Sequence, residues 1–551
     1  MIHRHRDCDA DLTFRLNKQI LITLKESAGT TIWDFSVIPA PNRGSVFTMQ
    51  PTVILGWVAV YFTALMSLAW WTGRKADDQS YFLGNRRSPW IIVALGLIGD
   101  SLSGVSYISV PGKVARDHFG YLQVVFGYVL GYLIIAFVLL PLYYRLGLTS
   151  IYAFLGQRFD PVAQKTGSAF FLVSRLLGSA ARLFLAINVF QSFVFSDWGI
   201  PFWMTSAAVI LLILTYTLRG GIKTLVWTDT FQTAFLVAGI LTAILALTLA
   251  LKQNSPLSKL VMTLLNGPET TLFNWDWRSP GYFWKQFFSG AAIAVVMTGL
   301  DQNNMQKALS CRSLGDAQKN IALFAPIMVA VHIAILLLGA LLFRFADSRG
   351  ISLPERSDDL FPTLALRHLG TFPAILFVLG LTAATFNSAD SVLTTLTTSF
   401  CIDFLRFESR NDLTDRQRLQ RRRRIHAAFA GILLLTILLF RALSNGTALI
   451  DLVLKLAGYT YGPLLGLFTL GLTTRIRAGG WPVPVVGLLA VAGSALLDFN
   501  SAAWFNGYRF GFELLLLNGF LMAIGMVLFA GKSTPPPLKF TGNFTSIPSR
   551  S

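Results

Sequence analysis

Long apolar runs separated by short polar segments dominate the sequence. A helix that crosses the hydrocarbon core of a bilayer needs about 20 consecutive, mostly apolar residues. Strands of a membrane β-barrel would be shorter and would alternate. The pattern therefore predicts an all-α integral membrane protein with about 13 transmembrane helices. The candidate spans are 51–73, 90–111, 121–144, 166–195, 201–218, 225–251, 282–300, 321–343, 372–400, 425–443, 447–470, 481–498 and 510–530.

Composition supports a membrane location. Only 13% of the 551 residues are charged, 53% are hydrophobic, and the mean hydropathy is +0.56. Soluble domains carry about 25% charged residues, so this chain has too few to cover a water-exposed surface. This excludes a soluble enzyme, a disulfide scaffold and a disordered chain. The three cysteines, Cys8, Cys311 and Cys401, are too far apart to form a metal or disulfide framework.

The net charge of +18 fits basic cytoplasmic loops better than nucleic-acid binding. With the amino end outside, the inner loops hold most of the basic side chains. We therefore expect a multi-pass protein of the inner (plasma) membrane, with the N-terminus outside and the C-terminus cytoplasmic. The inner-loop residues are Arg74, Lys75, Arg86, Arg87, Arg219, Lys223, Lys307, Arg312, Lys319 and the basic side chains of 406–424.

The two ends of the chain differ from the apolar middle. Residues 1–48 are polar and directly precede Met49 and the first span. Our hypothesis is that translation starts at Met49 or that 1–48 is a disordered extension. The segment 533–551 contains three consecutive prolines and reads as a disordered tail.

Two spans are interrupted by small and polar residues. The second contains Gly96, Gly99, Gly104 and Pro111, with clustered serines, and the seventh continues as TGLDQNN at 298–304. Irregular backbone at membrane depth occurs where it lines a cavity, although glycine can also serve close helix packing. Interrupted helices five spans apart indicate a transporter with two inverted five-helix repeats. The segments would be 49–89 (an extra first helix and loop), 90–251 and 252–470 (the repeats), and 471–532 (two further helices).

Two arginines lie inside the fourth span. Arg182 follows Arg175 by seven residues, so the two share a helix face. Ionisable groups at membrane depth are functional candidates. For Arg182, a carboxylate substrate and an internal ion pair with Asp100 or Asp229 are both open. For Arg175 we favour the internal pair.

The ninth span gathers oxygen-bearing side chains. Ala384, Asn387, Ser388 and Ser391 share one helix face. Asp390, Thr394 and Thr395 flank that face, and the span holds no His. Hard oxygen ligands with few charges suit Na⁺ rather than zinc. Asp229, at the start of the sixth span, is either a helix cap or an ion ligand.

Four separated motifs resemble the sodium:solute symporter family. The resemblance covers about 50–530 and implies a ten-helix inverted-repeat core after one extra helix. It also implies a transporter rather than an enzyme, with partners limited to a small solute, sodium ions and lipid, and we expect a monomer. The motifs are YFLGNRRSPW (81–90), RGGIKTLVWTDTFQ (219–232), DQNNMQKALS (301–310) and GYTYGPLLGLFTLG (458–471).

The resemblance also implies site residues. A shared sodium site would join carbonyls of Gly99 and Leu102 to Ala384, Asn387 and Ser388, where Asn387 departs from the usual Ser or Thr. Some members have a second sodium site, which here would be Asp229, Asp390 and Ser391.

Within the family, DSLSGVSYISVPGK (100–113) is similar to the first core helix of sialic acid transporters. That similarity implies a solute site at Ser101, Ser103, Ser106 and Arg182. The glutamine expected in the next helix is replaced by Val125, so we add the nearby Gln123 to the solute site. We therefore expect Na⁺-coupled import of a small organic solute bearing a carboxylate. A neutral sugar or polyol, or a passive channel, is the alternative.

Overall fold

The computed structural model describes residues 50–73, 84–217, 222–252, 267, 270–407, 412, 414–443, 449–476 and 479–529. All of them belong to one compact unit, Val46–Ser551. The predictions for 1–48 and 533–551 concern segments outside the described residues.

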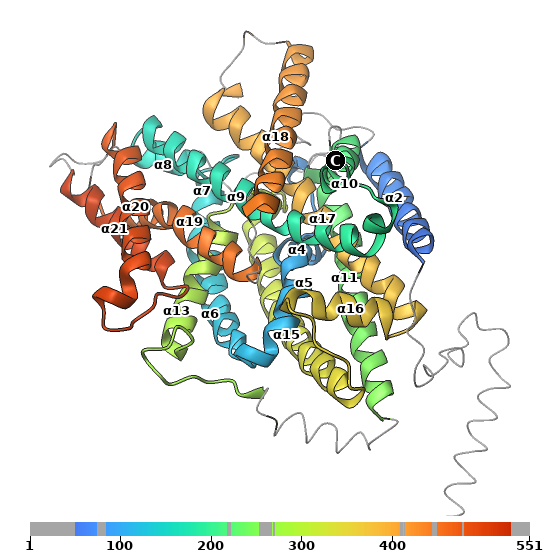
Figure 1. Ribbon diagram of the computed structural model, residues 1–551. Helices are drawn as coiled ribbons and strands as arrows, with labels where there is room; N and C mark the ends of the chain where they lie inside the picture. The colour runs from blue at the N-terminus through green and yellow to red at the C-terminus, as the bar shows by residue number, and fades with distance from the viewer. Residues whose placement is uncertain are drawn as a thin grey trace, which may run out of the picture. The chain divides into compact units, whose positions relative to one another are not determined.

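Helices make up nearly all of the described chain, and in this part of the chain the only β contact is an isolated bridge between Ser88 and Cys311 (Figure 1). The helices are α2 (Pro51–Gly73), α4 (Trp90–Ser101), α5 (Gly104–Asp117), α6 (Tyr121–Ile134), α7 (Leu140–Arg145), α8 (Ala153–Arg158), α9 (Pro161–Phe190), α10 (Phe202–Thr217), α11 (Ile222–Lys252), α13 (Phe283–Ala294), α14 (Gln302–Leu309), α15 (Leu314–Ser348), α16 (Leu360–Arg367), α17 (Thr371–Ser399), α18 (Asp415–Leu443), α19 (Leu449–Thr473), α20 (Pro482–Trp504) and α21 (Leu514–Leu528).

The prediction of a helical membrane protein with many spans is confirmed, but the number of thirteen spans is not. Among the described residues, eight helices are long and apolar enough to cross a bilayer, or ten if each of two bent pairs is one span. The remaining three predicted spans coincide with α10, α19 and α21, and of these α10 and α21 are shorter apolar helices. The division into two repeats remains a prediction.

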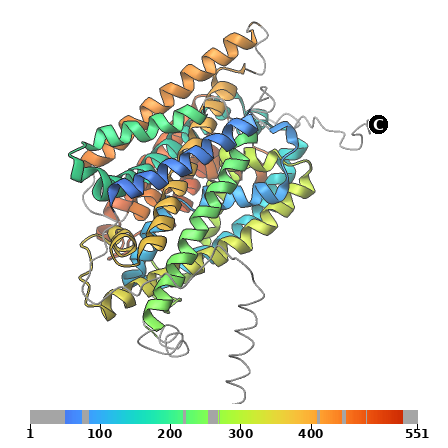
Figure 2. The ribbon, with the colours of Figure 1, turned by 90° about the vertical axis from the view of Figure 1, so that its right-hand side faces the viewer.

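Large apolar side chains on the outer helices face away from the bundle. Trp71 on α2, Leu211 on α10 and Leu435 on α18 are all largely exposed. Figure 2 shows α2 on the outer side of the bundle. Exposed apolar side chains over whole helices suit a lipid environment, where they meet no water.

The two predicted interruptions are real. The α4–α5 pair bends by 56° at Leu102 and Ser103, and the pair formed by Phe283–Gly299 and α14 bends by 63°. The second break follows a π-helical turn, η7 (Val295–Gly299). The prediction of interrupted helices is therefore confirmed at both places.

Helices α6 and α13 approach each other more closely than side chains would allow. A Cβ at Gly127 of α6 would clash with the Phe287 carbonyl, and one at Gly290 of α13 would clash with the Val124 carbonyl. Each backbone therefore fills the space in which the other helix would carry a side chain.

The polar interior lies where α4, α9, α11 and α17 pack together. Nearly every described side chain of α17 from Phe377 to Thr398 is buried, including the oxygen-bearing side chains that drew attention in the sequence. This interior brings the candidate residues together.

Candidate functional site

The first helix break exposes backbone polar groups inside the protein. α4 ends at Ser101, and the Leu102 amide donates to the Ile98 carbonyl at 2.8 Å. The last carbonyls of a helix have no partner within the helix. Ser103 precedes α5 in an extended conformation, and its side chain does not cap that helix. The break thus offers carbonyl oxygens on one side and amide hydrogens on the other.

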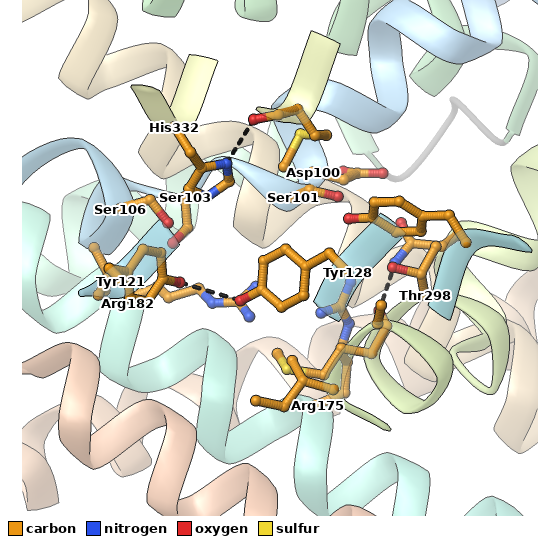
Figure 3. Close-up of a pocket in the computed structure, with 17 residues that line it drawn as sticks. Asp100, Ser101, Ser103, Ser106, Tyr121, Tyr128, Arg175, Arg182, Thr298 and His332 are labelled. Carbon is orange, nitrogen blue, oxygen red and sulfur yellow. Dashed lines mark hydrogen bonds between the residues drawn. The ribbon is translucent and has the colours of Figure 1, made fainter. Parts of the chain in front are cut away.

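A cavity of about 80 Å³ lies against this break (Figure 3). Ser101, Ser103, Ser106 and Arg182, which the sequence placed in a solute site, all line it. The opposite wall comes from α6, from α15 and from the helix preceding the second break. Its remaining lining residues are Asp100, Val105, Tyr121, Tyr128, Tyr132, Arg175, Ile293, Ala294, Met297, Thr298, Asn304, Met328 and His332.

The two arginines of α9 have different surroundings. Arg175 forms an ion pair with Asp301, with Nε 3.1 Å from Oδ2, and the Tyr461 hydroxyl donates to the same oxygen at 3.0 Å. Arg182 is only 8% exposed, and within the described part of the chain no carboxylate lies at ion-pair distance from it. Arg175 does form an internal ion pair, but its partner is Asp301 and not the expected Asp100 or Asp229. The pair of Arg182 with Asp100 or Asp229 is not formed.

The rest of the cavity wall is aromatic and moderately polar. The hydroxyls of Tyr121 and Tyr128 lie 3.1 Å apart, and His332 Nδ1 lies 2.7 Å from the Met328 carbonyl. Ile293 and Met297 supply apolar surface. The arrangement can enclose a small organic molecule with one cationic anchor.

Gln123 lies outside this cavity. Its amide nitrogen donates to the carbonyls of Gly120 and Gly281 at 3.2 and 3.1 Å, and its oxygen accepts from the Asn274 amide at 3.2 Å. It lines a separate, wider cavity of about 720 Å³, which shares only Tyr121 with the first. In this structure Gln123 holds the segment 274–281 rather than facing the arginine.

Two residues of the first predicted sodium site, Gly99 of α4 and Asn387 of α17, lie side by side. A Cβ at Gly99 would clash with the Asn387 amide nitrogen and the Thr233 hydroxyl, so all three groups are adjacent. Asn387 is 1% exposed, and neither amide atom has a hydrogen-bond partner among the described residues. Ala384 lies buried one turn earlier on α17. Ser388 follows Asn387, and its side chain is outside the described atoms.

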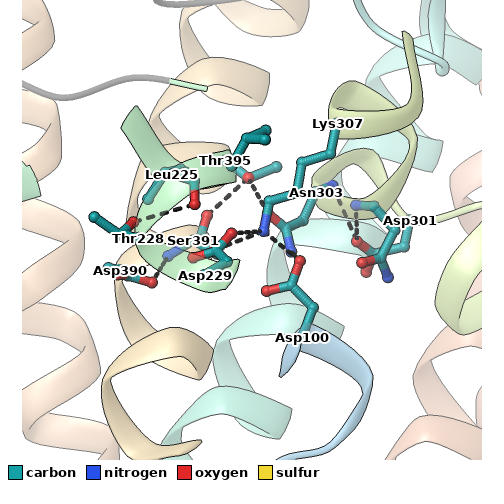
Figure 4. Close-up of polar contacts among 12 residues, drawn as sticks. Asp100, Leu225, Thr228, Asp229, Asp301, Asn303, Lys307, Asp390, Ser391 and Thr395 are labelled. Carbon is teal, nitrogen blue, oxygen red and sulfur yellow. Dashed lines mark hydrogen bonds and ion pairs between the residues drawn. The ribbon is translucent and has the colours of Figure 1, made fainter. Parts of the chain in front are cut away.

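The residues of the second predicted sodium site lie around an amino group. Asp229, Asp390 and Ser391 are fully buried, and Lys307 of α14 contacts Asp229 and Ser391 (Figure 4). Its Nζ forms ion pairs with Asp100 and Asp229, the latter at 2.5 Å, and donates to Ser391 Oγ at 2.9 Å. Asp229 lies inside α11 and is therefore not its cap.

Sequence reasoning missed Lys307 and Asn303 as members of this cluster. We predicted Lys307 in an inner loop, and this is wrong, because its side chain is 0% exposed. Asn303 also belongs to the cluster, with Nδ2 donating to Asp100 Oδ2 at 3.2 Å. The usable signal was the hydrophilic stretch QNNMQK directly after an interrupted span, since such a stretch can be buried only against other polar groups.

Comparisons with known proteins agree with this architecture. The sodium-coupled monocarboxylate transporter 2 of Danio rerio is 25% identical over 443 residues, covering 78% of this chain and 67% of that protein. The sodium/sialic acid symporter NanT of Aliivibrio fischeri is 24% identical over 509 residues, covering 88% and 94%.

A solved structure of a Na⁺-coupled sialic acid symporter, in a substrate-bound outward-open state, matches with a TM-score of 0.73. It covers 87% of this chain and 99% of that one at 18% identity, so the likeness shows the fold. The family model matches residues 81–480. With its broken membrane helices and buried oxygen cluster, this chain belongs to the sodium:solute symporter family.

Proposed function

We propose that this transmembrane symporter uses Na⁺ to import a small solute whose carboxylate binds Arg182. The observation that carries the proposal is the environment of Arg182, which is buried and has no carboxylate at ion-pair distance among the described residues. A buried charge without a counter-charge is costly. A solute carboxylate would remove that cost and accept two parallel hydrogen bonds from the guanidinium.

The hydroxyl groups at the break would complete the solute site. Ser101, Ser103 and Ser106 line the same cavity as Arg182. They can donate to a carboxylate or to solute hydroxyls. The two relatives described above are named for a monocarboxylate and for sialic acid, and both solutes carry a carboxylate. The small cavity favours a compact solute.

A sodium ion would bind between α4 and α17. Carbonyls of Gly99 and Leu102, with Ala384, Asn387 and Ser388, would provide the oxygen ligands. The buried Asn387 amide, without a hydrogen-bond partner in the described chain, supports this site because such groups are normally satisfied. Hard cations prefer carbonyl and amide oxygens of this kind.

Sodium at this position would stabilise the break that forms the solute cavity. The coupling is reciprocal, so Na⁺ raises solute affinity by the factor by which solute raises Na⁺ affinity. We place the amino end outside and the carboxyl end in the cytoplasm. In that orientation the membrane potential contributes about 2.3 kcal/mol per 100 mV to inward movement for each net positive charge that the cycle carries. Access would alternate through relative movement of the two predicted repeats.

A neutral sugar or polyol is the second candidate. The serines and three tyrosines around the cavity suit solute hydroxyls as well as a carboxylate. In that case Arg182 would donate a hydrogen bond to the solute, and the solute would not neutralise its charge.

The test is uptake into proteoliposomes of monocarboxylates, sugar acids, amino acids and neutral sugars, with Na⁺ or choline outside. We expect one carboxylate class to accumulate only with Na⁺. Arg182→Gln should lower its uptake efficiency about 100-fold, since two charge-assisted hydrogen bonds contribute about 3 kcal/mol. Arg182→Lys should also lose most of the uptake efficiency, because an ammonium cannot bind a carboxylate bidentately.

The matched control is Lys165→Gln, which removes a positive charge from an exposed position on the same helix. Its uptake should equal that of the parent. Carboxylate uptake at full rate in Arg182→Gln would exclude the proposed anchor, and Na⁺-dependent uptake of a neutral sugar alone would favour the second candidate.

The sodium site has its own test. Ser388→Ala and Asn387→Ala each remove one proposed ligand, and we expect the Na⁺ concentration for half-maximal uptake to rise about tenfold, which corresponds to about 1.4 kcal/mol. An unchanged Na⁺ dependence in both variants would show that the site lies elsewhere.

A further inference from the structure

The Lys307 amino group is fully coordinated by oxygen atoms of three other helices. An ammonium has three N–H donors. Here they meet Asp100 on α4, Asp229 on α11 and Ser391 on α17 (Figure 4). The amino group thus joins the first broken helix to two of the helices packed around it.

Further hydrogen bonds keep this amino group in place. Asn303 donates to Asp100, and Asn303 Oδ1 accepts from the Thr395 hydroxyl at 3.1 Å. Thr395 in turn lies one turn beyond Ser391 and donates to its carbonyl at 2.8 Å. Both carboxylate partners are almost completely buried, and so is Lys307 itself. The cluster is a built site rather than a chance contact.

Two oxygen-bearing residues of this cluster are also predicted ligands of a second sodium ion. Asp229 and Ser391 belong to both sets, and the third predicted ligand, Asp390, accepts from the Ser391 amide at 2.5 Å. A sodium ion bound to Asp229 and Ser391 would therefore lie directly beside an ammonium group. Two like charges at contact distance in a buried environment repel strongly.

We propose that the Lys307 ammonium takes the place of a second sodium ion, so that the symporter binds a single Na⁺ per chain. Lys307 is a cation tethered to the protein, held by two carboxylates and a hydroxyl. This inference rests on the proposed function for the one remaining sodium site, between Gly99 and Asn387. Asp100 belongs to the proposal as well, because it supplies a second carboxylate for the amino group.

The net charge moved per transport cycle follows from the binding of one Na⁺ per chain. A tethered ammonium does not cross the membrane with the solute. One Na⁺ with one monovalent carboxylate moves no net charge, whereas two Na⁺ would move one positive charge. Uptake of a monocarboxylate should therefore not respond to an imposed membrane potential.

The deciding experiment is equilibrium binding of radioactive sodium ions to the purified full chain in detergent. We expect one ion per chain in the unaltered protein and in Lys307→Arg, which keeps the charge. Lys307→Met keeps the length and removes the charge, so it should bind twice as much sodium. In Asp100→Asn/Lys307→Met the additional ion should be lost or bound at least tenfold more weakly, since one carboxylate is missing.

If the unaltered protein binds two sodium ions, this result alone overturns the inference, whether or not any variant folds. A folded Lys307→Met that binds one ion would overturn it too, because removal of the ammonium then frees no site. If the unaltered protein binds no sodium at all, the sodium site of the proposed function fails, and the inference fails with it.

Discussion

The two helix breaks of this protein differ in the hydrogen-bond partners of the backbone groups that each break frees. At the second break, Asp301 caps α14 by accepting from the amides of Asn303 and Asn304 at 2.9 and 3.3 Å. Tyr143 and Tyr152 donate to the carbonyls of Gly299 and Leu300 at 2.9 and 3.0 Å. The protein itself closes this break.

Among the described residues, the first break has no comparable set of hydrogen-bond partners. Ser103 does not cap α5, and Ser101, Ser103 and Ser106 line the cavity. The arginines follow the same division, since Arg175 pairs with the cap of the second break and Arg182 lies at the cavity beside the first. The comparison suggests that a closed break maintains the fold while an open break serves ligands.

The strongest challenge to this comparison is Asp301→Ala. It removes the helix cap and leaves Arg175 buried without its partner, so we expect a loss of about 3–5 kcal/mol in stability. Thermal unfolding of the purified protein in detergent would measure this as a large fall in Tm. Arg182→Gln is the matched variant, and its Tm should be unchanged or higher, because it removes a buried charge that has no counter-charge. Equal Tm values for the two would remove the distinction between a structural and a functional arginine.

An intermediate effect is expected at the contact between α4 and α17. Gly99→Ala places a methyl group against the Asn387 amide and the Thr233 hydroxyl, and overpacking of this kind costs about 1–3 kcal/mol. Stabilisation by Na⁺ in a thermal-shift assay should weaken at the same time.

Gly178→Ala on α9 is the control for that variant. A Cβ there meets no atom within 4 Å, so the change should raise stability by about 0.5–1 kcal/mol through helix propensity. If both alanines shift Tm in the same direction, the close approach of α4 and α17 is not as described.

The smallest expected effects come from single hydroxyl groups. Ser106→Ala at the first break should raise the solute KM about fivefold with Tm unchanged, because one hydrogen bond contributes about 1 kcal/mol. Tyr152→Phe at the second break should lower stability by a similar amount and leave KM unchanged. Parallel uptake kinetics and thermal unfolding would measure both, and a reversed pattern would contradict the comparison.

The parts of the fold that depend on local sequence were predictable. Long apolar runs located the helices, and clusters of Gly, Ser and Asp located both breaks, because each signal lies within one segment. The apolar run 201–218 matches α10 closely, whereas the run 510–530 gave the shorter helix α21.

Contacts between distant segments were harder to predict. Lys307 lies 207, 78 and 84 positions from its three partners, so no local pattern reveals that Asp100, Asp229 and Ser391 would surround it. Gln123 was placed in the solute site by its nearness in sequence to an expected position. In the structure its hydrogen bonds go to the backbone near Asn274 and Gly281 instead.

The glycine contact between α6 and α13 limits which parts of the cavity can change shape. Because the two backbones pack directly against each other at Gly127 and Gly290, we expect the two helices to move together. Tyr128 of α6 and Ile293 of α13 both line the cavity, and we expect them to move as one wall if access alternates as proposed. Room for a larger solute would then have to come from the other helices that line the cavity, among them α9 with Arg182.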